Sequence, residues 1–175
     1  MKLIKLKSNL NKLLLILLLL STYSFFVFSQ TLYDFRRFKV ILEKFKYDKS
    51  VHNIVMINLD GTGLFKRTYK AGKSELIQKK EFDVSVDQLE YIYYVLMKNR
   101  FLEISGDIGD PSIQQGYVVR LTAVFDRQTH QVTLYNENNL AVFKIMRAIL
   151  RITPKEYARV FEDDYTGDID KIELE

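Results

Sequence analysis

Two histidines and three closely spaced carboxylates are the side chains of this sequence best suited to chemistry. His52 and His130 could each serve as a general base near neutral pH, and each stands at the start of a separate predicted strand. Glu103, Asp107 and Asp110 could supply oxygen ligands to a cation or form part of a hydrolytic site. No spacing in the sequence joins the histidines to each other or to these carboxylates. We therefore predict that both histidines are structural and that no residue is catalytic.

The common catalytic motifs are absent, which also argues against catalysis. The chain has no cysteine, so it has no thiol nucleophile, and it lacks the Gly-x-Ser-x-Gly and Ser-x-x-Lys patterns of acyl-transfer enzymes. It also lacks the His-Glu-x-x-His metal motif and the glycine-rich nucleotide motifs. We expect a protein that is not an enzyme and uses no metal or cofactor. The alternative is a hydrolase or metal-dependent enzyme whose site is assembled from distant carboxylates.

A loop at residues 105–116, "SGDIGDPSIQQG", is the best candidate for a binding element. Glycine and proline permit unusual backbone angles there, and loops longer than a minimal connection are often functional. We take Asp107, Asp110 and Ser112, with Tyr117 just beyond the loop, as the candidate binding residues. The alternative is a loop that is merely mobile.

An apolar run near the N-terminus, "LLLILLLLSTYSFFVFSQ", predicts export. Four lysines and no acidic residue precede it, as in a secretory signal. Residues 13–28 fall short of the roughly 20 apolar residues that a spanning helix needs. Val27 and Ser29 fit a signal-peptidase site, so we predict a signal peptide over residues 1–29, removed after Ser29. The alternative is an uncleaved membrane anchor.

Removal of that segment changes the interpretation of the charge. The net charge of +4 equals the contribution of its four lysines, which leaves the rest of the chain neutral. A neutral chain argues against nucleic acid as a partner, because phosphate contacts need clustered Lys and Arg. The remaining length suits one domain over residues 30–162, followed by a solvated acidic tail over 163–175.

Hydrophobic periodicity predicts two hairpins and two main helices. The first hairpin covers residues 54–59 and 64–69 around an Asp-Gly turn, and the second covers 117–125 and 130–135. Residues 86–99 form a helix with a capping box at Ser85 and Gln88, and Asn139 caps a second helix. A short third helix follows Thr153, where Thr-x-x-Glu suggests another capping box.

We therefore expect an α+β fold. Its antiparallel sheet would consist of the two hairpins, with two main helices packed on one face and a short C-terminal helix. Residues 35–46 fit either a helix or a fifth, N-terminal strand. As a basic amphipathic helix they could instead lie on an anionic membrane.

The element order resembles a group of small exported bacterial domains of unknown function. The resemblance rests on "NLDGTG", "FDVSVDQLEYIYYVLMKNRFLEI", "GYVVRLTAVFD" and "HQVTLYN", within residues 38–152. It implies a strand near residues 38–45 and supports the α+β fold. The layout is also similar to that of the emfourins, protein inhibitors of thermolysin-like metalloproteases.

These observations favour an exported, non-enzymatic module that binds another exported or envelope protein. The chain contains 11 tyrosines, a residue type that favours binding surfaces. We expect it in the periplasm or outside the cell, with no stable membrane anchor after cleavage. A protease inhibitor is the special case in which the loop at 105–116 enters an active-site cleft.

Overall fold

The computed structural model describes residues 36–112 and 115–162. They belong to the second of two units of the chain, Phe35–Glu175, while the first unit, Met1–Asp34, lies outside the described residues. The predicted signal peptide at 1–29 and the predicted acidic tail at 163–175 likewise lie outside them.

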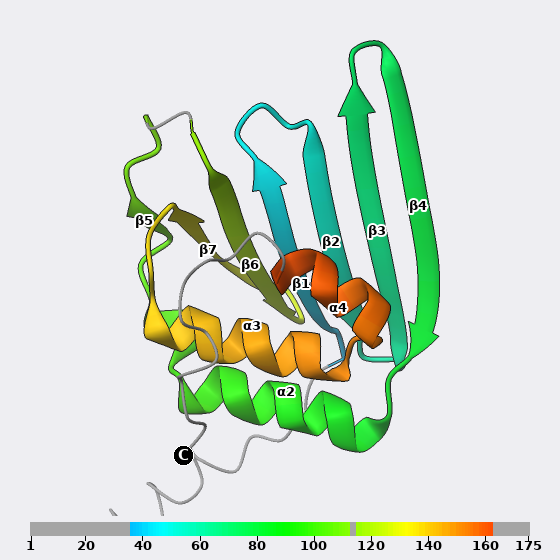
Figure 1. Cartoon of the computed structure of the whole chain (residues 1–175). Coiled ribbons are helices and arrows are strands. Elements are labelled where there is room, and N and C mark those ends of the chain that lie inside the picture. The colour runs from blue at the N-terminus through cyan, green and yellow to red at the C-terminus, as the bar shows by residue number, and fades with distance from the viewer. Residues whose placement is uncertain (1–35, 113–114, 163–175) are drawn as a thin grey trace, which may run out of the picture. The chain divides into compact units, whose positions relative to one another are not determined.

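The described residues contain a seven-stranded sheet with the strand order β4-β3-β2-β1-β6-β7-β5 (Figure 1). Neighbouring strands are antiparallel except for β5 and β7, which are parallel, so the sheet is mixed. The strands are β1 (Phe38–Lys46), β2 (Val51–Asn58), β3 (Thr62–Ala71), β4 (Ser74–Asp83), β5 (Asp107–Gly109), β6 (Tyr117–Phe125) and β7 (Gln128–Tyr135).

Three α-helices accompany the sheet: α2 (Val86–Lys98), α3 (Leu140–Ile152) and α4 (Lys155–Glu162). A short 3-10 helix, η2 (Phe101–Glu103), follows α2. Aromatic contacts join helices to strands: the Tyr93 ring of α2 meets Phe38 edge-on at 6.1 Å, and Tyr157 of α4 stacks on Phe65 at 4.7 Å. Figure 1 shows α3 and α4 in front of the sheet and α2 beside α3.

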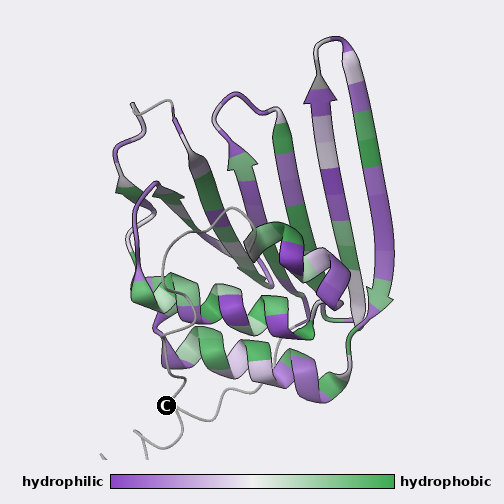
Figure 2. Cartoon of the chain, viewed as in Figure 1, coloured by the Kyte–Doolittle hydropathy of each residue, from purple (hydrophilic) through white to green (hydrophobic). Residues whose placement is uncertain are grey.

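Side chains alternate between the two faces of the sheet. Leu42 is opposite Val55 and Leu121, all three fully buried, on the face that also carries Phe38 and Phe65; we call this the helix-side face. Glu43, one residue on, is opposite Ile54 and Arg120, and these residues define the outer face. Figure 2 shows the corresponding alternation of hydrophobic and hydrophilic residues along the central strands. Successive side chains of a strand point to opposite faces, so the period of two determines which residues lie on each face.

Local signals in the sequence explain where the predicted elements begin. The Ser85 side chain accepts a hydrogen bond from the Gln88 backbone N–H, and the Gln88 side chain accepts one from the Ser85 N–H, which confirms the predicted capping box. The Asn139 side chain caps α3 through Val142 N–H at 3.0 Å. Gly61 has a φ of +81°, which the tight turn between β2 and β3 requires.

The prediction of an α+β fold is confirmed, but the sheet built from two hairpins is wrong. Residues 38–46 are a strand, which settles the choice left open by the sequence, and β4 and β5 were not predicted at all. β4 was missed because it is exposed along nearly its whole length and so lacks an alternating buried side. β5 shows that the loop at 105–116 contributes a strand to the edge of the sheet.

A second correction concerns Thr153, which was predicted to form the capping box of the short third helix. Its hydroxyl donates to the Ile149 carbonyl at 2.9 Å, so this residue terminates α3. The predicted helix α4 nevertheless follows directly, with Tyr157 and Ala158 N–H groups bonded to the Pro154 carbonyl.

Candidate functional site

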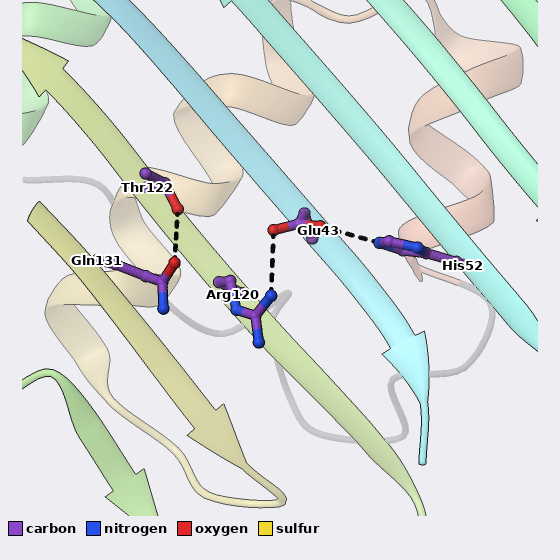
Figure 3. A network of polar contacts seen from close by, with 5 residues as sticks. All are labelled: Glu43, His52, Arg120, Thr122 and Gln131. Atoms are coloured by element: carbon purple, nitrogen blue, oxygen red, sulfur yellow. Dashed lines mark hydrogen bonds and ion pairs between the residues drawn. The ribbon is translucent and has the colours of Figure 1, made fainter. Parts of the chain in front are cut away.

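A polar network on the outer face is the most developed arrangement of ionisable side chains that the described residues show (Figure 3). The pairing of β1 with β6 places Glu43 directly opposite Arg120, and the β1–β2 hairpin places His52 opposite Phe45. The Glu43 Oε1 atom lies 3.0 Å from His52 Nε2, and Glu43 Oε2 lies 3.7 Å from Arg120 Nη1. Strand register thus brings Arg120, which is remote in the sequence, to Glu43 and His52 of one hairpin.

Phe45 supports the network from the same strand as Glu43. Its ring meets the His52 ring edge-on at 5.3 Å, and the Arg120 guanidinium lies over it at 5.2 Å. A cation over an aromatic face is attracted by the ring quadrupole, and a guanidinium stacks well on such a ring. The imidazole and the guanidinium are therefore held on either side of one carboxylate and beside one ring.

The environment of Glu43 stabilises its charged form. The hydrogen bond with His52 is the largest cause that lowers the pKa of Glu43, and the positive charge of Arg120 lowers it further against the opposing effect of burial. Both carboxylate oxygens are occupied, one by each partner. The side chains of His52 and Arg120 remain about one-third exposed. His52 and Arg120 can therefore donate hydrogen bonds to a bound molecule, whereas both oxygens of the Glu43 carboxylate already have partners.

Polar groups continue from this network across β6 and β7. Thr122 is opposite Gln131, and its hydroxyl donates to Gln131 Oε1 at 3.5 Å, a long hydrogen bond (Figure 3). The Arg120 Nε atom is buried and has no hydrogen-bond partner among the described residues. The outer face therefore has a polar strip that runs over four adjacent strands.

The predicted binding residues do not form one cluster. Asp110 Oδ1 accepts a hydrogen bond from Ser112 N–H at 2.8 Å, and the Ser112 side chain and backbone lower the pKa of Asp110. Asp107 is exposed in β5. The Tyr117 ring instead lies near the Lys44 and Lys46 ammonium groups, at 4.8 and 5.5 Å.

The residues considered for catalysis are also separated. Glu103 forms an exposed ion pair with Arg100 at 3.6 Å. His130 lies 3.1 Å from the Ile104 carbonyl through Nε2, and its ring meets Phe101 edge-on at 5.0 Å. In the part of the chain that the structure describes, no group of three His, Cys, Asp or Glu residues is placed to hold a metal ion.

A second polar feature is buried under α4. Lys44 is 1% exposed and donates from Nζ to the Phe161 carbonyl at 2.7 Å. Its cross-strand neighbour Asn53 is fully buried, and neither side-chain amide atom has a hydrogen-bond partner among the described residues. Burial of Lys is unusual unless it is paired, so this contact fixes the end of α4 against β1.

Neither Glu43 nor Arg120 was predicted from the sequence as a site residue, and His52 was predicted without a partner. One signal was present: Phe38, Val40 and Leu42 place apolar side chains at every second position, as expected if this segment is a strand with one buried face. That signal identifies the face on which Glu43 lies. It does not identify β6 as the neighbour that brings Arg120 to it.

The comparisons with known proteins found no match to any family model or to any curated protein. Among the described helices, none is both long and apolar enough to cross a membrane.

Proposed function

We propose that this chain is an exported, non-enzymatic module that binds another exported or envelope protein through the outer face of its sheet. The observation that carries the proposal is the network of Glu43, His52 and Arg120. Figure 3 shows these side chains in front of the strands and the helix ribbons behind the strands.

Apolar residues surround the network on the same face. Ile41, Phe45, Ile54 and Met56 are each partly exposed and alternate with the buried helix-side residues of β1 and β2. A partly apolar centre with oriented polar groups is the usual composition of a protein-binding patch, and arginine and aromatic residues are enriched in such patches. The partner would bury the apolar side chains and accept hydrogen bonds from Arg120 and His52.

The same geometry argues against catalysis by the network. A general base needs a carboxylate or imidazole atom that can take up a proton from a substrate. Glu43 has both oxygens engaged, and among the described residues no hydrogen bond joins Glu43, His52 or Arg120 to a serine or threonine that it could activate. The network is thus better suited to recognition than to proton transfer.

Export enters the proposal from the sequence, through the lysine-flanked apolar run in residues 1–29. It places the partner in the periplasm or outside the cell, where a chain with no cysteine avoids unwanted disulfide formation.

Site-specific photo-crosslinking in the native host tests the proposal. A photoreactive residue at Met56 samples the outer face, and one at Tyr94, which is 57% exposed on α2, is the matched control. We expect a discrete crosslinked partner from Met56 only, with a bait whose intact mass lacks residues 1–29. Equal adducts from both positions, or none from Met56, would contradict the proposal.

The identity of a captured partner separates this function from the inhibitor special case. A protease whose turnover stops on binding would make the chain an inhibitor. Hydrolytic activity that disappears when Glu103, Asp107 and Asp110 are changed to alanine would instead support the enzyme alternative.

A further inference from the structure

β4 is an open edge of the sheet. It stands at one end of the strand order and runs for ten residues, whereas the strand at the other end, β5, has three. Leu76 and Ile77, in the first half of β4, are 70% and 54% exposed. An edge strand presents unpaired backbone N–H and C=O groups on its free side, which makes it a template for another strand. No described residue pairs with that side of β4.

The side chains of β4 on the outer face follow a regular charge order. Ile54 is opposite Lys66, and Lys66 is opposite Lys79, so the odd-numbered residues of β4 share the face of Glu43. With Lys73 in the preceding turn, these positions read Lys73, Glu75, Ile77, Lys79, Glu81 and Asp83. From Lys73 to Glu81 the order is antisymmetric about Ile77: each cation lies as far from Ile77 on one side as an anion lies on the other.

We propose that two copies of this chain pair antiparallel through β4, with Ile77 opposite Ile77 of the partner subunit. This register places Glu75 opposite Lys79 of the partner subunit and Lys73 opposite Glu81 of the partner subunit. Two-fold symmetry repeats each pair, so four opposite-charge pairs flank one apolar contact. The two sheets become one continuous sheet with both sets of helices on the same side.

Neighbouring registers are electrostatically less favourable than the one centred on Ile77. Centring the pair on Gln78 places Glu75 opposite Glu81 of the partner subunit, which offsets the favourable pair of Lys73 with Asp83 of the partner subunit. Centring it on Leu76 places Lys73 opposite Lys79 of the partner subunit. Like charges directly opposite on adjacent strands are destabilising. In the register centred on Ile77, the helix-side positions pair Ser74 with Lys80 and Leu76 with Gln78, without any like-charge contact.

The single chain has an electrostatic reason to accept this partner. Lys66 and Lys79 face each other across β3 and β4, an unfavourable like-charge pair. Within the chain Lys79 has Glu81 at 3.3 Å, on its own strand. The register adds a carboxylate beside Lys79 from the free side of β4. A uniformly acidic strand would place negative charge opposite Glu75 and Glu81. The mixture of cations and anions along β4 therefore favours a second copy of this chain over an acidic peptide.

The interface is small, because it consists of one strand from each copy, and its ion pairs are exposed. We therefore expect a weak dimer whose formation depends on protein concentration and weakens as salt is raised. This pairing is independent of the proposed partner-binding function, because it uses the edge of the sheet and leaves the outer face of β1, β2 and β6 free.

Sedimentation velocity on the protein as the native host produces it tests the dimer over about 1 μM to about 1 mM, the range of weak association. Lys79→Glu and Glu75→Lys should each weaken dimerisation at least about tenfold, which is the effect of roughly 1.4 kcal/mol. Mixing the two single variants should restore assembly, because each supplies the charges that the other lacks. Lys79→Glu also removes the like-charge contact with Lys66, so it is expected to fold. Glu90→Lys, an exposed change on α2, is the control and should leave dimerisation unchanged.

Cysteine crosslinking tests the register. The chain has no cysteine, so Ile77→Cys introduces a single thiol at the proposed two-fold axis. Opposed residues in antiparallel strands have Cα atoms about 4.5–5.5 Å apart, within the range that a disulfide bridges. Ile77→Cys should form a disulfide-linked dimer faster than Glu75→Cys does. A monomer at every concentration, single variants that dimerise like the wild type, a mixture that fails to assemble, or equal crosslinking at both positions would overturn the proposal.

Discussion

Replacement of Glu43 by glutamine tests whether the outer-face network is an electrostatic unit. Glu43→Gln keeps the shape of the side chain and an acceptor for His52 but removes the charge. A hydrogen bond to a charged group contributes about 1.5–3 kcal/mol and a neutral one about 0.5–1.5 kcal/mol. A partly exposed ion pair such as that with Arg120 adds about 0.2–1 kcal/mol. Since the Glu43 side chain is 17% exposed, we expect the free energy of unfolding to fall by about 1–2 kcal/mol at pH 7.

The pH dependence of this difference gives the sharper test. Because the folded protein lowers the pKa of Glu43, its carboxylate contributes stability above the pKa of the unfolded chain. That contribution is lost as the pH falls through the lower, folded pKa. The unfolding free energies of wild type and Glu43→Gln should therefore converge under acid conditions.

Urea denaturation at a series of pH values from about 7 to about 3 measures both quantities. Glu90→Gln, an exposed carboxylate change on α2, is the matched control and should stay within about 0.5 kcal/mol of wild type. A Glu43→Gln variant as stable as wild type at pH 7, or a deficit that is constant with pH, would refute the electrostatic account.

Three further substitutions test the elements that position the site, each by urea denaturation. Ser85→Ala removes the capping box of α2 and should cost about 1 kcal/mol; an unchanged midpoint would contradict its role. Gly61→Ala forces a side chain into a left-handed turn with its Cβ 2.8 Å from the Val84 carbonyl, so a loss above about 1 kcal/mol is expected, and a gain would be inconsistent with the turn. Phe161→Ala empties a fully buried position and should cost about 3–5 kcal/mol and expose α4 to proteolysis; full protection of α4 would show that Phe161 does not anchor it.

Helices and central strands were predictable because burial leaves a period in the sequence. Leu89, Ile92, Tyr93 and Leu96 recur at helical spacing in the sequence, and all four are buried on α2, while Tyr94 off that stripe is 57% exposed. The alternation in residues 117–125 likewise matches β6. In each case one side of the element packs against the core, so the spacing of apolar residues reports its geometry.

β4 and β5 could not be predicted for the same physical reason. β4 is held by its pairing with β3, from Thr62 opposite Asp83 to Ala71 opposite Ser74, and its side chains pack on little. Residues such as Glu75, Gln78 and Lys79 do not themselves favour a strand. β5 is three residues long and depends on β7, which follows it by about twenty positions in the chain.

The outer-face network was hidden by sequence distance. Glu43 and Arg120 meet only because β1 pairs with β6, and no local pattern identifies that neighbour. The charge order of β4 was visible in the sequence, but it has meaning only once residues 74–83 are known to form an edge strand.

The most direct test of the proposed function is the affinity of the protein captured through Met56 for three purified forms of this chain. These are wild type, Arg120→Ala on the outer face, and Arg151→Ala, which removes an exposed arginine from the last turn of α3. We predict that Arg120→Ala weakens binding at least about tenfold and that Arg151→Ala does not change it, as expected when an interface centre rather than a distant charge is altered. Equal affinities for all three forms would show that the partner does not bind the outer face.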